Sequence, residues 1–138
     1  MASETLSGSC LCGAIQYKIS GDVQTFLHCH CRRCRKSSGT GHASNMILKP
    51  DSVEWISGQE KLAGFKVPDA DRFGTVFCSV CGCPMPRVTP DMSFAVIPAG
   101  SLDHEPEMTP VGRIFSDSKV AWSCDNSELP IWPEYPGS

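Results

Sequence analysis

The sequence predicts an all-β fold with minor helix, and three observations support this. Short runs of β-favouring residues recur along the chain, and clusters of Gly, Pro, Asp and Ser separate them. The eleven prolines suit short strands and turns better than long helices. The 138 residues contain no repeat, linker or low-complexity tract, so we expect one domain over residues 1–138.

The first predicted strand covers residues 14–20, whose apolar side chains Ile15, Tyr17 and Ile19 alternate onto one face. Gly21-Asp22 is a typical turn sequence, so residues 23–28 are expected to form the partner strand of a hairpin. Further short β-like runs, each bounded by turn-forming residues, lie at residues 43–48, 53–56, 75–77, 93–97 and 112–115.

Only residues 31–38 predict a helix, because they are dense in Arg and Lys and are followed by Gly39, a residue that commonly ends helices. The tail, residues 129–136, is too rich in proline for regular structure. We expect it to pack on the body of the protein through its large apolar side chains, which are Leu129, Ile131, Trp132 and Tyr135.

The net charge of −3 gives no reason to expect nucleic acid or an anionic membrane surface as a partner. No run approaches the ~18 apolar residues that a membrane span needs. Residues 1–6 lack the basic and apolar regions of a secretory signal, so the expected location is the cytoplasm. The nine cysteines, an odd number, are therefore expected to be reduced and to bind metal rather than to form disulfides.

Seven of the cysteines fall into three clusters at metal-ligand spacings. We call them the N-terminal pair (Cys10 and Cys12), the trio (Cys29, Cys31 and Cys34) and the distal pair (Cys78 and Cys81). Two thiols in a Cys-x-x-Cys turn reach one metal ion, and so do two thiols in Cys-x-Cys on a strand, where residues i and i+2 share a face. These spacings predict zinc, and we expect two ions.

Two partitions of the ligands fit the spacings. In a zinc ribbon, Cys31 and Cys34 would share one ion with the distal pair, and Cys10, Cys12 and Cys29 would be unused. Alternatively, the N-terminal and distal pairs form a closed four-sulfur site. The trio then forms a three-sulfur site with one open position, as in catalytic zinc centres. The second partition leaves no cluster unused.

Three motifs resemble one known family: residues 8–13, Gly-Ser-Cys-Leu-Cys-Gly, with Tyr17; residues 29–36 with Gly39; and residues 77–82, Phe-Cys-Ser-Val-Cys-Gly. Residues 99–103, Trp122 and Leu129-Pro130 extend the similarity in the same order. The chain resembles the glutathione-dependent formaldehyde-activating enzymes, a family that also includes centromere protein V.

The resemblance implies a β-tent, in which two sheets lean together around a structural zinc. It assigns this ion to Cys10, Cys12, Cys78 and Cys81, and a catalytic zinc to Cys29, Cys31 and Cys34. It also implies a carbon–sulfur lyase that acts on S-hydroxymethylglutathione or a related small thiol conjugate, with glutathione as thiol partner. Because three thiolates give the second ion a net negative charge, we expect this zinc to be labile.

Four basic residues lie beside the trio: Arg32, Arg33, Arg35 and Lys36. Arg35 and Lys36 match the family pattern, so we predict that they receive the carboxylates of the substrate. His28 and His30 alternate with the trio and are expected to point away from the metal. His42 and His104 carry no motif and are expected at the surface. Cys83 and Cys124 are expected to be core or surface thiols.

The alternative to an enzyme is a non-catalytic, zinc-stabilised interaction module, as centromere protein V suggests. A third hypothesis is a redox or metal-buffering protein that uses the labile site. A cavity beside the trio favours the enzyme, and its absence would favour the interaction module.

Overall fold

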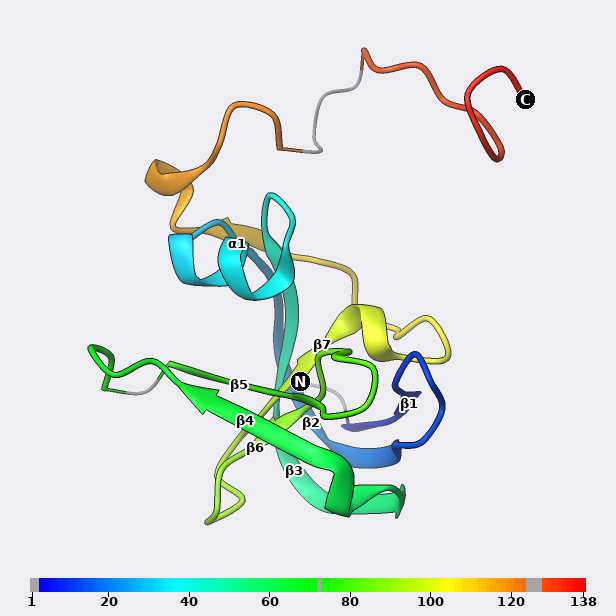
Figure 1. Ribbon diagram of the computed structural model, residues 1–138. Coiled ribbons are helices and arrows are strands. Elements are labelled where there is room, and N and C mark those ends of the chain that lie inside the picture. The colour runs from blue at the N-terminus through cyan, green and yellow to red at the C-terminus, as the bar shows by residue number, and fades with distance from the viewer. Residues whose placement is uncertain (1–2, 72, 124–127) are drawn as a thin grey trace.

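The structure is a computed structural model that describes residues 3–71, 73–123 and 128–138. The fold is mostly β, as predicted, and α1 (Arg32–Ser38) is the α-helix of the described residues. Six strands form the larger sheet, and β4 (Leu62–Lys66) and β5 (Gly74–Cys78) form a separate two-stranded sheet. The two open sheets lie across one another in Figure 1, which agrees with the predicted tent-like arrangement.

Two long antiparallel strands form the centre of the larger sheet: β2 (Gln16–Cys29) and β3 (Ala43–Ser57). The turn predicted at Gly21-Asp22 is wrong, because β2 continues through these residues. The strand has a register irregularity there, and Gly21 lies opposite Pro50. A Cβ on Gly21 would clash with the carbonyl oxygen of Lys49, so the glycine permits close strand pairing rather than a turn.

The other strands complete the sheet around this pair. Strand β1 (Ser3–Ser9) pairs with β2 on one side, and β8 (Gly112–Ile114) runs parallel to the end of β2. On the other side β7 (Ala95–Pro98) pairs with β3, and β6 (Arg87–Val88) pairs with β7.

The runs predicted at residues 75–77, 93–97 and 112–115 correspond to β5, β7 and β8, whereas the runs at 43–48 and 53–56 are parts of one strand, β3. Short 3₁₀ turns lie at Gln59–Lys61, Ala99–Ser101 and Ser116–Ser118.

Helix α1 follows directly from the end of β2 and is capped at both ends. The Cys31 sulfur accepts a hydrogen bond from the backbone N–H of Cys34 at 3.3 Å, which makes Cys31 the N-cap. Gly39 ends the helix in the left-handed region, with φ of 76°, and its N–H donates to the carbonyl oxygen of Arg35. The predicted helix and its end are confirmed.

The core lies against the larger sheet. Ile15, Tyr17 and Ile19 are completely buried, as their alternation predicts. The Tyr17 hydroxyl group lies 2.6 Å from the Ser101 hydroxyl, which ties β2 to the turn after β7. Burial raises the pKa of Tyr17 to about 12, so this phenol stays protonated and keeps its hydrogen bond at physiological pH.

The prediction that the tail packs on the body is wrong. Ile131 is 92% exposed and Tyr135 is 82% exposed. The tail's proline nitrogens cannot donate hydrogen bonds, and the N–H groups of Glu134 and Ser138 donate to acceptors within the tail itself. Figure 1 shows this segment extending away from the sheets.

Candidate metal centres and the adjoining cavity

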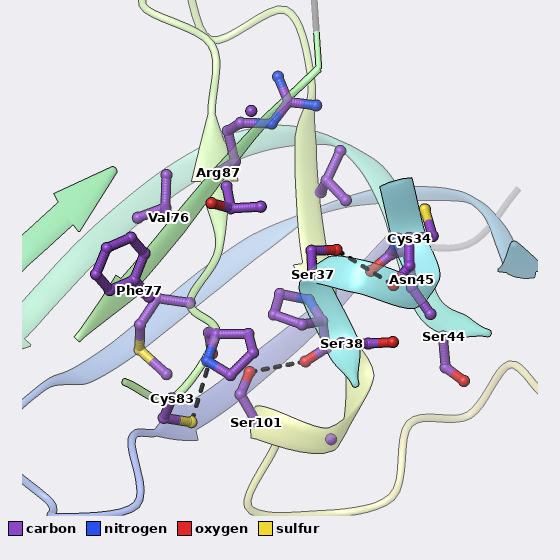
Figure 2. Close-up of a pocket in the computed structure, with 18 of the residues that line it drawn as sticks. Cys34, Ser37, Ser38, Ser44, Asn45, Val76, Phe77, Cys83, Arg87 and Ser101 are labelled. Atoms are coloured by element: carbon purple, nitrogen blue, oxygen red, sulfur yellow. Dashed lines mark hydrogen bonds between the residues drawn. The ribbon is translucent and has the colours of Figure 1, made fainter. Parts of the chain in front are cut away.

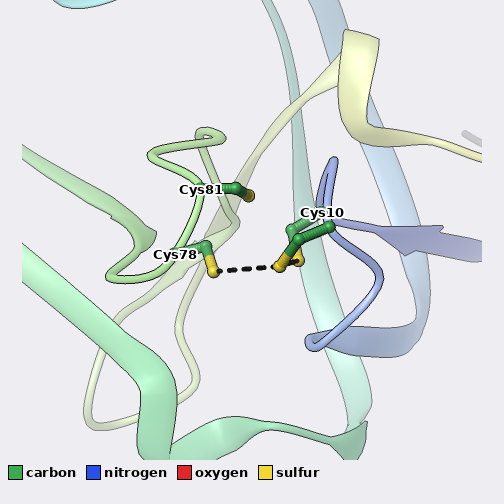
Figure 3. A group of neighbouring side chains, drawn as sticks. Cys10, Cys78 and Cys81 are labelled. Carbon is green, nitrogen blue, oxygen red and sulfur yellow. Dashed lines mark hydrogen bonds between the residues drawn. The ribbon is translucent and has the colours of Figure 1, made fainter.

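The N-terminal and distal pairs come together in space. The sulfurs of Cys10, Cys12, Cys78 and Cys81 all lie within 4.8 Å of one another. The Cys10 and Cys12 sulfurs are 3.6 Å apart, and those of Cys12 and Cys78 are 3.9 Å apart. Sulfurs bound at about 2.3 Å to a tetrahedral zinc ion lie about 3.8 Å apart, so these four residues fit a closed zinc site (Figure 3).

Two tight turns aim these sulfurs inward. Gly13 and Gly82 follow the two pairs with φ of 80° and 77°, a conformation that glycine adopts without strain. The N–H of Gly82 donates to the carbonyl oxygen of Cys78 at 2.8 Å and closes the second turn. Backbone N–H groups also reach the sulfurs, from Ile15 to Cys10 at 3.2 Å and from Val80 to Cys78 at 3.4 Å.

The backbone also favours the ionised form of one of these thiols. The N–H of Cys83 donates to the Cys81 sulfur and lowers the pKa of that thiol to about 6. Cys81 is therefore a thiolate at neutral pH, which is the form that binds metal.

The trio forms a second group at the junction of β2 and α1. The sulfurs of Cys29, Cys31 and Cys34 lie within 4.8 Å of one another. Cys29 and Cys34 are each 6% exposed, and Cys31 is half-buried. Among the described residues, no fourth Cys, His, Asp or Glu joins this group. The geometry therefore offers three ligands, and one corner of a tetrahedron is available to a further ligand.

Burial and backbone hydrogen bonds act differently on these three thiols. Burial raises the pKa of Cys34 and of Cys29, since it disfavours the charged sulfur. Burial is also the largest single effect on Cys31, but the hydrogen bonds from the N–H groups of Cys34 and Arg33 and from the other two thiols together outweigh it and lower the pKa of Cys31. Cys31 is thus the one thiol of the trio whose pKa is lowered.

The grouping of the sulfurs corresponds to the second partition of the ligands. Cys31 and Cys34 lie in one group and Cys78 and Cys81 in another, so the described structure does not form the ribbon in which they share an ion. No buried carboxylate belongs to either group, and an all-thiolate donor set suits zinc rather than calcium or magnesium.

Three histidine rings lie against one another, and two of them, His28 and His30, flank Cys29 in the sequence. The rings of His28 and His42 are 4.2 Å apart, and those of His30 and His42 are 5.2 Å apart. His30 is completely buried, and its Nε2 accepts a hydrogen bond from Arg113 at 3.0 Å. His28 Nδ1 lies 2.9 Å from the Ser44 hydroxyl. Burial lowers the pKa of His28, so that its ring is neutral at physiological pH. His42, which was expected at the surface, is half-buried.

A cavity of about 560 Å³ lies beside the trio (Figure 2). Cys34, Ser37 and Ser38 of α1 form one wall, and the start of β3 continues it. The opposite wall comes from β5, β6 and residues 82–85, which follow the distal pair. The cavity has the size of small-molecule sites in proteins, about 300–1,000 Å³.

Two predicted substrate contacts, Arg35 and Lys36, are not among the residues that line this cavity. Sequence reasoning missed two that are, His42 and Arg87. Neither belongs to a local motif. The pairing of β6 with β7 brings Arg87 to the cavity, and His42 directly precedes β3. Cys83 is half-buried and also lines the cavity, whereas Cys124 lies outside the described residues.

These features define a β-rich protein with one four-sulfur and one three-sulfur cluster, the second beside a ligand-sized cavity. The family model of the glutathione-dependent formaldehyde-activating enzymes matches residues 5–118. The chain belongs to this family. The match spans all seven cysteines of the two clusters.

A crystal structure of a Rhodobacter sphaeroides protein, determined in a structural genomics programme, has a similar fold. The TM-score is 0.53 at 17% sequence identity, over 78% of this chain and 99% of that one. No curated protein sequence matches the chain. In the part of the chain that the structure describes, no helix is long and apolar enough to cross a membrane.

Proposed function

We propose that this protein is a zinc-dependent carbon–sulfur lyase that acts on a glutathione adduct resembling S-hydroxymethylglutathione, or on a related small thiol conjugate. One observation carries the proposal: the trio, with three sulfurs and an open corner, contributes Cys34 to the wall of a ligand-sized cavity. A metal ion held there would be accessible to a substrate, whereas the four-sulfur site is complete without one.

A zinc ion bound by the trio would supply Lewis acidity that favours the thiolate form of the departing sulfur. The chain's own groups arrange this step. The N–H of Cys34 fixes the Cys31 sulfur, and α1 and β2 hold the other two sulfurs. In the lyase direction the adduct's hydroxyl group loses its proton, the carbonyl group forms and the C–S bond breaks. The proton then returns to the sulfur, so an aldehyde and a thiol leave.

The four-sulfur site would hold a structural zinc through Cys10, Cys12, Cys78 and Cys81. Arg35 and Lys36 directly follow Cys34 in the sequence, and their contact with a substrate stays a prediction. The non-catalytic interaction module has less support, because a purely structural second ion needs no ligand-sized cavity beside it.

The two ions should differ in affinity. Titration of the zinc-loaded protein with a chelator is expected to remove one equivalent well before the other, because the trio offers three ligands and one open corner. Metal content and circular dichroism, measured at each step, should show that the fold survives the first loss. Simultaneous loss of both ions would contradict the assignment of a labile second site.

Cobalt in place of zinc makes the open corner visible, because a fourth thiolate alters the sulfur-to-cobalt charge-transfer absorption. Glutathione is expected to change the spectrum of the wild-type protein. The Cys31→Ser variant should not respond, since it retains cobalt only at the four-sulfur site. An unchanged wild-type spectrum at millimolar glutathione would refute the thiol substrate and favour the interaction module.

A further inference from the structure

The cavity beside the trio has a simple charge pattern. Arg87, on β6, is the one permanently charged side chain among the described residues that line it, and no aspartate or glutamate of that set contributes to its walls. In Figure 2 Arg87 lies across the cavity from the α1 wall that carries Cys34 and Ser37. A ligand that reaches both walls would therefore meet the helix wall that carries Cys34 at one end and a guanidinium group at the other.

The Arg87 guanidinium group has hydrogen-bond donors without a partner in the described structure. Its contact within the described structure is with the ring of Phe94, whose centre lies 6.0 Å from the guanidinium carbon. No hydrogen bond or ion pair links Arg87 to any other side chain in the described ranges. Five N–H donors in a planar fork match the two oxygens of a carboxylate. The side chain is half-buried, which reduces screening of its charge by water.

Helix geometry separates Arg87 from the basic residues of α1. Cys34, Ser37 and Ser38 share the helix face that lines the cavity. Successive residues of an α-helix are rotated by about 100°, so Arg35 and Lys36 lie on other faces. Neither belongs to the cavity wall. Arg87 is thus better placed than either of them to meet a negative group of a ligand inside the cavity.

Asn45 adds a second recognition group. Its side chain lines the cavity from β3, and no hydrogen bond of that side chain to another described residue is present. A carboxamide offers both donors and an acceptor, which suits an amide group of a ligand. Together the walls match a thiol that carries both an amide and a carboxylate, as a thiol-containing peptide does.

We propose that Arg87 binds a carboxylate of the substrate and makes the protein selective for carboxylate-bearing, peptide-like thiols. The inference rests on the proposed function, because it places the substrate's sulfur at the trio. It concerns a different part of the ligand, however, and can be tested separately.

The test measures ligand affinity by calorimetry on the zinc-loaded protein. The probes are glutathione, S-methylglutathione, which has no free thiol, and the diethyl ester of glutathione, which has no carboxylate. Arg87→Gln is expected to weaken both carboxylate-bearing probes about 10- to 100-fold, the range for a charge-assisted hydrogen bond. The diester should bind weakly and equally to the wild type and the variant. Arg87→Lys keeps the positive charge but lacks the planar guanidinium group. Its affinity for the carboxylate-bearing probes should lie between those of the wild type and Arg87→Gln.

Lys18→Gln is the matched control, since it removes one positive charge from an exposed position on β2. It should change each affinity less than about twofold. Melting curves establish that each variant is folded. If Arg87→Gln does not fold, the affinities of Arg87→Lys are compared with those of the wild type instead.

The outcomes separate the two proposals. If S-methylglutathione binds through Arg87 and glutathione binds no more tightly, the carboxylate site stands and the thiol-lyase proposal fails. If glutathione binds equally to the wild type and to Arg87→Gln, the carboxylate site is refuted and the lyase proposal stands. If Arg35→Gln or Lys36→Gln weakens the binding of glutathione and Arg87→Gln does not, the carboxylate site at Arg87 is likewise refuted. Failure of both carboxylate-bearing probes to bind the wild type refutes both proposals.

Discussion

Replacement of Cys78 by serine is expected to yield unfolded or insoluble protein. Cys78 is completely buried and ends β5, where its sulfur lies 3.9 Å from that of Cys12. The four-sulfur site thus links the two-stranded sheet to the turn between β1 and β2. A structural zinc contributes roughly 10 kcal/mol or more to folding. The whole stability of a domain is about 5–15 kcal/mol, so loss of one ligand removes most of it.

Cys83→Ser provides the matched control for this experiment. Cys83 lies in the same turn but outside the four-sulfur group, so its variant should remain soluble and bind the same amount of zinc. Soluble yield, zinc content and thermal melting of the two variants are the measurements. A Cys78→Ser protein that melts like the wild type would show that this cysteine holds no structural metal.

Replacement of Cys34 by serine is expected to have the opposite pattern: the fold persists and the activity is lost. The variant should bind one zinc ion instead of two. Its melting temperature should fall by only a few degrees, because serine retains most of the volume but places a hydroxyl group at a buried position. Lyase activity should fall on the order of 10²-fold or more, as expected when a metal that stabilises a developing charge is lost.

Metal analysis, melting curves and turnover of S-hydroxymethylglutathione test this prediction. A Cys34→Ser protein with full turnover would rule out a catalytic role for the trio. A variant that unfolds as Cys78→Ser is expected to do would instead make the trio a second structural site.

Local sequence predicted the parts of the fold that depend on local pattern. The alternation of Ile15, Tyr17 and Ile19 defines a buried strand face wherever that strand lies, and Gly39 ends a helix without tertiary help. Gly21-Asp22 has the composition of a turn, but its conformation is decided by the facing strand, which supplies Pro50. Strand β1 was missed because it is rich in Ser and Thr and buries few apolar side chains.

The cysteines could be found from the sequence because metal geometry constrains the spacing of neighbouring ligands. The grouping of the N-terminal and distal pairs depends on contacts between residues 66 positions apart, and it required the resemblance or the structure. Arg87 could not have been predicted, because a two-residue strand carries no periodicity. Its place in the cavity depends on the pairing of β6 with β7.

The turn that carries Cys78 and Cys81 continues directly into residues 82–85, which form part of the cavity wall. The four-sulfur site therefore supports the shape of the cavity as well as the stability of the fold. If both sites hold zinc, as we propose, a zinc shortage would act on the protein in two stages. Loss of the ion at the trio alone would inactivate a protein that stays folded and recovers when zinc returns. Loss of the ion at the four-sulfur site would disrupt the cavity wall, and recovery would then require refolding. The amount of active protein would thus depend on the zinc supply. Its recovery would be slower after a severe shortage than after a mild one, because a severe shortage also empties the four-sulfur site.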